Sequence, residues 1–553
     1  MVMTYIQMPK DSNSESKSTE NCSEKNSAGD LFSRFRDESR GAVLILLAIF
    51  LVPMMVFIGL AMELALTEDI RVKLQNTSDS ASLASADLEQ VLEPEDVVND
   101  FFAKAGLADN LRNVTVVNTA TERTVSVESD AFVPALLTRL AGRTGWDVPV
   151  VGAATESRRD LEIAVALDNS GSMSWAPGST SGPAANPSRM DLLIPAAEAF
   201  VDAVQPKPGQ PGTTTISLIP FATQVSVGED LLNNFTVSAE HSTSHCVTFN
   251  STADYTTTAV PTNTLLNRTA HHDPSSTGWD LNTYNTVCPT DSARRDIVAW
   301  SEDPEVLKAR IRAMQPYGYT SIEMAAKWGA AMLDPSLRPV LSALSGTPGY
   351  EHLSGPAGRG MPYDFNNPDA LKYLIVMSDG ANTQNFDIRP PYREGNSPLF
   401  RLPGTNNYSY YRNRSGTGRD FYRVSGDYWS FTPGNGAVQM TWPEVWADMP
   451  VDRFVDSILS EADTSRSANG HYNRIVRTRT GTWKNNRTSA ICQAAKDNDV
   501  IVFTIGMDTY GQGDATLADC ASSPAYFYDV NGLDIEEAFA SIARQINKLR
   551  LTQ

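Results

Sequence analysis

The sequence contains few of the residues that common catalytic sites need. It has 6 histidines in 553 residues, no His-Glu-x-x-His motif and no Gly-x-Ser-x-Gly turn after a predicted strand. The signatures of a zinc protease and of an α/β-hydrolase are therefore missing. His271, His272 and Asp273 could ligate a transition metal, but without a third ligand motif a solvated loop explains them better. The sequence favours a protein that is not an enzyme, with a metal-dependent hydrolase as the weaker alternative.

Basic residues are also in deficit. The chain has 65 acidic residues against 45 lysines and arginines, which gives a formal net charge of −20. Binding to a phosphate backbone needs a basic face, so this balance disfavours nucleic acid as a partner. Cations and neutral or basic surfaces are the better candidates.

Long apolar runs are confined to one place. Residues 41–62, GAVLILLAIFLVPMMVFIGLAM, carry no charge and match the length of a helix that crosses ~30 Å of hydrocarbon. The run is too long for a cleaved signal peptide and lacks an obvious cleavage site, so we expect a retained, single membrane span. Arg34, Arg36 and Arg40 precede it, whereas acidic residues follow it first. This asymmetry predicts a cytoplasmic N-terminus, with the bulk of the chain outside.

Cysteine is scarce, and its distribution agrees with this topology. The chain has 5 cysteines and no Cys-x-x-Cys spacing, which argues against a zinc cluster. Cys22 falls on the cytoplasmic side, and the other four lie in the predicted outer part, where disulfides are stable. Proximity in sequence suggests the pairs Cys246–Cys288 and Cys492–Cys520, with four buried thiols as the alternative.

Composition divides the chain into four stretches. Residues 1–36 are polar and serine-rich and are predicted to be a disordered cytoplasmic tail. Residues 37–87 hold the apolar run and a helical continuation with small side chains. Residues 88–158 combine one helix with segments in which valine and threonine alternate, which predicts a small α+β module. Residues 159–553 form the main domain.

The main domain alternates apolar strands with amphipathic helices. Segments such as LEIAVAL and LKYLIVMS are apolar on both faces, which predicts a doubly wound, mostly parallel sheet with helices on both sides. Insertions at about 226–302 and 383–450 interrupt the pattern and are too long to be structureless loops. The second contains NNYSYYRNRSGTGRDFYRVSGDYWSF, whose aromatic residues and arginines are typical of binding hot spots. They either overhang the site described next or pack within the insertion itself.

Polar side chains follow two of the predicted strands where each strand ends. Asp168 ends the first, with Ser170 and Ser172 on the same loop; Asp379 follows the second, and Thr320 precedes a later helix. Ligands bind at the carboxyl ends of parallel strands, so we expect Asp168 and Asp379, with the two serines beside Asp168, to converge. Their oxygens suit a hard cation, magnesium above all. Each residue also has a purely structural interpretation: turn serines, a helix N-cap in a Thr-x-x-Glu box, and an Asp-Gly turn.

The segments DNSGS, YGYTSIE and SDG closely resemble the von Willebrand factor A domain and its metal-ion-dependent adhesion site. The resemblance covers about residues 160–553, with all five positions in the expected order. It implies that Ser170, Ser172 and Thr320 supply hydroxyl ligands and that Asp168 and Asp379 act largely through waters. It also implies that an aspartate or glutamate of a partner protein completes the shell of Mg²⁺, or of another divalent cation such as Mn²⁺ or Ca²⁺.

The membrane-proximal sequence carries a second resemblance. The Arg-Gly before the apolar run and the LQNTSDSASLASA after it resemble the N-terminal segment of TadG-like proteins of the bacterial tight-adherence (Flp pilus) system. The run LADCASSPAYFYDVNGLDIEEAFASIARQI resembles the end of the von Willebrand domain in the same proteins, which implies a Cys492–Cys520 pair. The resemblance implies a protein of the bacterial inner membrane whose main domain is periplasmic or extracellular, with pilus or secretion components as partners.

The predicted function is therefore a membrane-anchored, non-enzymatic factor of Flp pilus assembly or adhesion that binds a partner carboxylate through a divalent cation. A pilin-like structural subunit is the alternative. A processed prepilin has a glycine at its cleavage point and a glutamate near the fifth position after it. Gly41 is present, but the following AVLILLAI contains no glutamate, which favours an unprocessed anchor.

Overall fold

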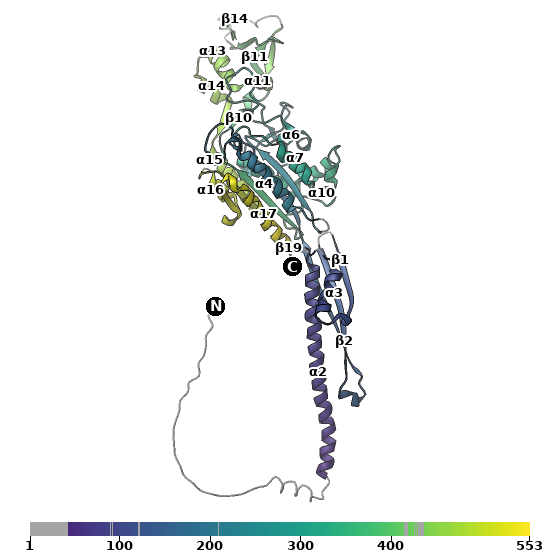
Figure 1. Ribbon diagram of the computed structural model, residues 1–553. Helices are drawn as coiled ribbons and strands as arrows, with labels where there is room; N and C mark the ends of the chain where they lie inside the picture. The colour runs from purple at the N-terminus through teal and green to yellow at the C-terminus, as the bar shows by residue number, and fades with distance from the viewer. Residues whose placement is uncertain are drawn as a thin grey trace, which may run out of the picture. The chain divides into compact units, whose positions relative to one another are not determined.

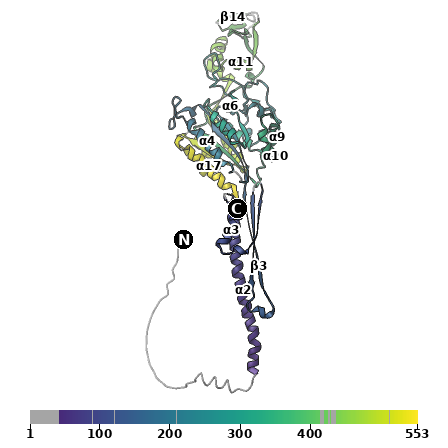
Figure 2. The same ribbon diagram turned by 45° about the vertical axis from the view of Figure 1, so that its right-hand side comes forward.

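The computed structural model describes residues 42–88, 90, 92–119, 122–207, 210–413, 419–424, 426, 428–429, 436–511 and 513–552. The tail predicted for residues 1–36 lies outside these ranges. Contacts divide the chain into two compact units (Figures 1 and 2). The first contains the described residues up to Asp79 together with 101–113 and 127–152; the second contains 80–100, 114–126 and the residues from Ala153 onward.

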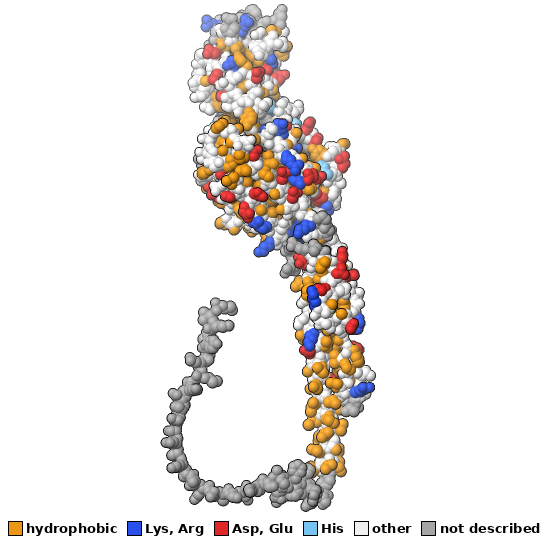
Figure 3. Space-filling model, viewed as in Figure 1, with side chains coloured by type: hydrophobic (Ala, Val, Ile, Leu, Met, Phe, Trp, Pro, Cys, Tyr) orange, Lys and Arg blue, Asp and Glu red, His pale blue; other side chains and the backbone are white. Residues whose placement is uncertain are grey.

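The long helix α2 (Ala42–Ala86) dominates the first unit. Its residues Val43–Ala86 form the one helix of the described chain that is long and apolar enough to cross a membrane, and residues 43–62 of the predicted span lie within it. Figure 3 shows hydrophobic side chains covering its N-terminal part. A four-stranded sheet has the order β1-β2-β3-β19. Its strands, and the helix between α2 and β1, are β1 (Leu111–Asn118), β2 (Glu122–Pro134), β3 (Gly145–Arg158), β19 (Leu551–Thr552) and α3 (Pro94–Lys104).

A six-stranded sheet of order β18-β17-β9-β4-β5-β8 forms the centre of the second unit. All neighbouring strands are parallel except β8, which pairs antiparallel with β5 at the edge. The strands are β4 (Asp160–Asp168), β5 (Thr214–Phe221), β8 (Val298–Ser301), β9 (Ala370–Ser378), β17 (Ile501–Met507) and β18 (Phe527–Val530). The predicted architecture, a mostly parallel sheet within a mixed α/β domain, is confirmed.

Helices cover both faces of this sheet because successive residues of its strands enter two separate cores. In β4, Leu161 and Ile163 belong to one core, and Ala164 belongs to the other. The first core is closed by α4 (Arg189–Val204), α7 (Pro304–Ala313) and α17 (Ile535–Arg550), and the second by α8 (Ile322–Met332), α9 (Arg338–Ser345) and α15 (Gly481–Lys496). Figure 1 shows α4 and α17 side by side. Small residues let α8 approach closely: a Cβ on Gly329 would lie 2.5 Å from Leu374 Cδ1.

The second insertion, together with the residues that follow it as far as Arg479, has a hydrophobic core of its own, in which the rings of Trp442, Trp446 and Phe454 contact one another. A five-stranded antiparallel sheet of order β14-β13-β12-β11-β15 contributes to it. The buried Tyr408 belongs to this core, and its ring also stacks on Trp279 of the first insertion. The elements are β10 (Asn385–Ile388), β11 (Asn396–Arg401), β12 (Tyr408–Tyr411), β13 (Phe421–Arg423), β14 (Tyr428–Trp429), β15 (Val438–Thr441), α11 (Trp442–Asp448), α12 (Val451–Phe454), α13 (Ser460–Ala462), α14 (Ala468–Ile475) and β16 (Val476–Arg479).

Both predicted disulfides are present. Cys246 and Cys288 join two parts of the first insertion, and Cys492 of α15 is bonded to Cys520. Cys520 ends α16 (Asp514–Cys520), so the second bond ties two helices together. The remaining short elements are α5 (Glu229–Leu232), β6 (Val247–Thr248), β7 (Asn267–Arg268), α6 (Ser292–Arg295) and α10 (Ser354–Gly358).

Candidate metal centre

The predicted site residues meet at the carboxyl ends of β4 and β9. Asp168 is the last residue of β4, and Asp379 directly follows β9, the strand that pairs with β4 in parallel. Ser170 and Ser172 lie on the loop after β4, where the chain forms the short turn Gly171–Ser174. Adjacent parallel strands therefore deliver both carboxylates to one edge of the sheet, as the sequence predicts.

Hydrogen bonds connect four of the five predicted residues. Asp168 Oδ1 accepts from Ser170 N at 2.7 Å, and Asp168 Oδ2 accepts from Ser378 Oγ at 2.6 Å. The hydroxyls of Ser170 and Ser172 lie 3.0 Å apart, and Ser172 Oγ donates to Asp379 Oδ1 at 2.8 Å. The loop after β4 is thus held against the end of β9 by its own polar side chains.

Thr320 reaches the same place from another loop. Gly171 N donates to Gly318 O at 3.0 Å, and Tyr317 N donates to Asn169 O at 2.8 Å, so the two loops run side by side. Gly318 has a φ of +64°, and a Cβ there would lie 2.6 Å from an oxygen of Thr223, so the close approach needs glycine. The N-cap of α8 is Ser321 rather than Thr320. The N-cap interpretation of Thr320 is therefore wrong.

Ser172, Thr320 and Asp379 line one cleft of about 170 Å³. Asp168 and Ser170 do not line it and are almost completely buried. All the side-chain atoms that the prediction names as metal ligands are hydroxyl or carboxylate oxygens, and a hard divalent cation prefers oxygen ligands. The described residues contain no group of three or more His, Cys, Asp or Glu that could hold a metal, so a site here depends on the hydroxyls.

Two residues that sequence reasoning missed complete the wall of the cleft. Arg189, the first residue of α4, donates from Nη1 to Asp379 Oδ2 at 2.7 Å, and its Nε lies 3.3 Å from Asp508 Oδ2. Asp508 also accepts from the backbone amides of Gly178 and Gly532, each at 3.0 Å. Asp508 directly follows β17, the other neighbour of β9, so the strand-end argument would have found it. Nothing comparable marks Arg189 in the sequence.

The cleft carries more negative than positive charge. Two carboxylates, Asp379 and Asp508, line it with the one guanidinium of Arg189, and the Asp168 carboxylate is buried close by, outside the lining. Burial, together with the Asp379 carboxylate, raises the pKa of Asp168 to about 7. Burial also raises the pKa of Asp379, against the opposing effect of Arg189. A cation in the cleft would offset this excess, so the residues present fit a divalent metal ion in charge as well as in donor type.

A buried lysine on α15 fixes the Thr320 loop from behind. Lys484 Nζ donates to Thr320 O at 2.5 Å, to Ser321 Oγ at 2.6 Å and to Thr383 O at 3.0 Å. It also lies 3.7 Å from a carboxylate oxygen of Glu323. Burial lowers the pKa of Lys484 and raises that of Glu323. The loop that supplies Thr320 is therefore anchored by one ammonium group, which donates to three oxygen acceptors in and beside the loop.

Among the described residues, His271, His272 and Asp273 are not part of any group of three or more His, Cys, Asp or Glu that could hold a metal ion. His272 Nδ1 lies 2.8 Å from Ala270 O, and Asp273 accepts from the backbone amides of Ser275, Ser276 and Asn282. Burial lowers the pKa of His271 to about 4. These residues stabilise a loop of the first insertion, as the structural interpretation holds, although the loop is buried rather than solvated.

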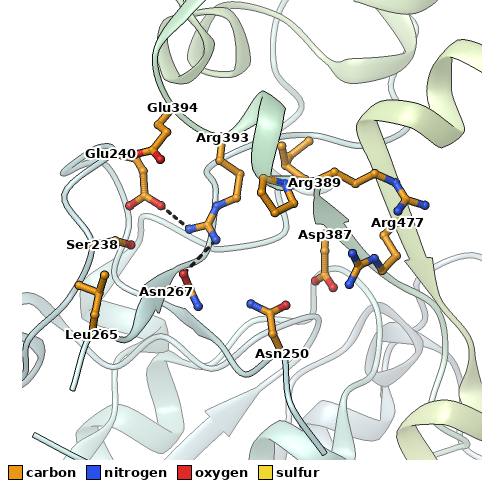
Figure 4. Close-up of a pocket in the computed structure, with 12 residues that line it drawn as sticks. Ser238, Glu240, Asn250, Leu265, Asn267, Asp387, Arg389, Arg393, Glu394 and Arg477 are labelled. Carbon is orange, nitrogen blue, oxygen red and sulfur yellow. Dashed lines mark hydrogen bonds and ion pairs between the residues drawn. The ribbon is translucent and has the colours of Figure 1, made fainter.

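A second cleft, of about 440 Å³, lies between the two insertions (Figure 4). Its charged side chains largely pair with one another or with nearby residues: Arg393 with Glu240, and Asp387 with Arg479. None of the five predicted residues lines it. The chemistry that the sequence predicts therefore belongs to the smaller cleft.

Comparison with known proteins finds a family to which the N-terminal part is similar. Residues 41–88 match the family described as "Putative Flp pilus-assembly TadE/G-like". The N-terminal segment is TadE/G-like. The match begins at the predicted span and includes the LQNTSDSASLASA stretch, so it confirms the resemblance that these residues carry. No curated protein matches the chain.

Several solved structures are similar to the chain at low identity. The von Willebrand domain of the type V pili tip protein Mfa5 from Porphyromonas gingivalis is 13% identical, covering 71% of this chain and 97% of that one, with a TM-score of 0.32. The PilB minor pilin from Streptococcus sanguinis is 11% identical (80% and 78% covered, TM-score 0.27). Proximal thread matrix protein 1 from the mussel byssus, with a zinc-occupied MIDAS motif, is 11% identical (72% and 99%, TM-score 0.18). At these scores the similarities do not assign roles to residues of this chain.

Proposed function

We propose that the protein is a membrane-anchored, non-enzymatic factor of Flp pilus assembly or adhesion, whose main domain binds a carboxylate of a partner protein through a divalent cation. The TadE/G-like segment supports the pilus system, and helix α2 supports the anchor. The arginines before the span support a cytoplasmic N-terminus in the inner membrane, with the main domain in the periplasm or outside the cell.

The convergence of Ser172, Thr320 and Asp379 on one cleft carries the proposal. Ser172 and Thr320 would hold the ion through their hydroxyls, and Asp379 would act on it largely through water. Asp168 and Ser170 would orient this set from the buried side. When bound, the ion would supply a positively charged position that a partner's aspartate or glutamate can occupy. Because few anionic side chains would bind the ion directly, it would keep enough positive charge to attract that carboxylate.

The same cleft supports a binding role rather than a catalytic one. Its lining contains no histidine, lysine or cysteine. Ser172 is hydrogen-bonded to Asp379 Oδ1, but no histidine accompanies this pair, and the other oxygen of the carboxylate is held by Arg189. The lining residues therefore suit binding and orientation better than activation of a nucleophile.

Mn²⁺ binding to the full-length protein in detergent tests this proposal. We expect Ser172→Ala to weaken Mn²⁺ binding by about tenfold or more, since a tenfold loss corresponds to ~1.4 kcal/mol for one lost ligand. Ser181→Ala, in an exposed loop, is the matched control and should bind as the wild type does. Electron paramagnetic resonance of free Mn²⁺ measures both, and Mg²⁺ should compete. Equal affinity of wild type and Ser172→Ala would refute a metal site at this cleft.

A further inference from the structure

The first unit contains, besides helix α2, the tip of the hairpin that β2 and β3 form. We propose that the tip of the β2–β3 hairpin, residues 132–146, lies in the headgroup region of the lipid bilayer that α2 crosses, on the side of the main domain. This inference rests on the membrane anchoring in the proposed function. It adds a contact that neither the apolar run nor the TadE/G-like match identifies.

Glu63 of α2 binds the hairpin tip through several hydrogen bonds. Its Oε1 accepts from the backbone amides of Leu136, Leu137 and Thr138 at 2.7, 2.8 and 3.0 Å. Its Oε2 accepts from the Thr138 hydroxyl and, at 3.4 Å, from Trp146 Nε1. Glu63 is completely buried by these contacts. A carboxylate held by several donors fixes the tip at one height along the helix.

Close packing one turn earlier fixes the same height. A Cβ on Gly59 would lie 2.3 Å from Leu137 Cβ, so Leu137 packs directly on the helix backbone where glycine leaves room. Gly59 belongs to the uncharged run 41–62, and Glu63 is the first charged residue after it. Four residues of helix rise only about 6 Å. The tip therefore lies at the end of the apolar run, which is where the hydrocarbon ends.

The exposed side chains of the tip suit this position. Phe132 and Leu136 are 57% and 55% exposed, although both are large and apolar. The exposed Arg143 lies over the ring of Trp146, with Cζ 3.9 Å from its centroid, and the exposed Arg139 is close in sequence. Aromatic rings and arginines with apolar neighbours are typical of the membrane interface, where one end of each side chain is apolar and the other meets water or a lipid phosphate. Figures 1 and 2 both show the hairpin tip beside α2.

Alternation of side chains accounts for how one hairpin makes both contacts. Ala131, Ala135 and Thr138 are buried, whereas Phe132 and Leu136 between them are exposed. Thr138 contacts Glu63 of the helix, and the exposed Phe132 and Leu136 are left for the surroundings. At the level of Glu63 those surroundings are lipid headgroups, because the polar region extends about 5–7 Å beyond the hydrocarbon on each side.

Quenching by spin-labelled lipids tests the proposal on the full chain. A Cys22→Ser background leaves the four disulfide-bonded cysteines and allows one fluorophore at Leu136→Cys, in vesicles of phosphatidylethanolamine and phosphatidylglycerol. Val151→Cys is the matched control, since Val151 is 57% exposed and its neighbour Gly152 contacts Ser78 of α2. Ser78 lies about 22 Å further along the helix than Glu63. Leu47→Cys, inside the apolar run, reports the span itself.

We expect lipid-borne nitroxides to quench labels at positions 47 and 136 at least threefold more than a label at 151. A label at Phe132→Cys should behave as the one at 136 does, and it serves if Leu136→Cys folds poorly. Quenching at 47 with position 136 equal to 151 would overturn the inference and leave the anchor intact; a tip that contacts another protein instead would give this result. Absence of quenching at 47 would overturn the membrane anchor itself.

Discussion

Replacing Arg189 by methionine is the most direct test of the charge balance at the cleft. The guanidinium lies between Asp379 and Asp508, and the three side chains are 2%, 1% and 0% exposed. Methionine keeps much of the volume and removes the charge. Two buried carboxylates then lose their cationic partner, which costs about 3–5 kcal/mol in the free energy of unfolding. We expect this loss when divalent cations are removed with EDTA.

Mg²⁺ should reduce that loss. In Arg189→Met the cleft has one positive charge fewer, so a cation bound there is held more tightly than in the wild type. If its affinity rises tenfold, the stability lost on substitution shrinks by about 1.4 kcal/mol at saturating Mg²⁺. The same coupling must appear as a tenfold lower Kd for Mg²⁺, because the two effects are linked.

Urea unfolding of the full-length protein in detergent, followed by tryptophan fluorescence with EDTA and with Mg²⁺, measures the first effect, and calorimetric titration the second. Arg312→Met is the matched control, because Arg312 is 55% exposed and pairs with Glu198 at the surface. It should cost less than about 1 kcal/mol, independent of Mg²⁺. A loss for Arg189→Met that is below 1 kcal/mol in EDTA, or that Mg²⁺ leaves unchanged, would refute the reasoning.

Two further predictions concern buried lysines. Lys484→Met removes the donor to Thr320 O and the ammonium group beside Glu323. We expect it to lower the free energy of unfolding by about 3–5 kcal/mol and to weaken Mn²⁺ binding. Unchanged Mn²⁺ affinity in the folded variant would contradict the anchoring role of Lys484. Lys327 donates to Thr257 O and Ala259 O, and burial lowers its pKa to about 8. Between pH 8 and about 10.4 the unfolded chain binds more protons than the folded chain, so the free energy of unfolding should rise with pH. In urea titrations across this range we expect that of the wild type to increase by up to about 3 kcal/mol relative to that of Lys327→Met. Parallel dependence of the two unfolding free energies on pH would exclude the pKa shift.

Local sequence was sufficient for the sheet and for most of the cleft. Strands such as β4 and β9 are mainly apolar and are buried at nearly every position, which requires a strand covered on both faces. Parallel strands end at one edge, so Asp168 and Asp379 had to come close once the fold class was known. The apolar run identified the helix that can span a membrane, and proximity in sequence identified both disulfides, because each closes a short stretch of chain.

The sequence could not predict contacts that depend on how distant elements pack. Arg189 lies 190 residues from Asp379 in the chain, and its role follows from where the first turn of α4 meets the ends of β9 and β17. Glu63 is one acidic residue among several after the span, and only the hairpin tip that reaches it distinguishes it from the others. The aromatic residues of the second insertion satisfied two interpretations equally, because composition does not say which neighbours a ring will find.

The sequence by itself therefore determined the main helices and strands, the polar residues at the strand ends and the oxygen ligands available for a cation. Hydrophobic periodicity and the chemistry of a short motif depend on residues that are close in sequence, so both can be identified from the sequence alone. Only the tertiary structure decided which buried charges face one another and which surfaces stay exposed. Those depend on side-chain packing between elements that are hundreds of residues apart, where a shift of a few ångströms decides whether a charge is paired.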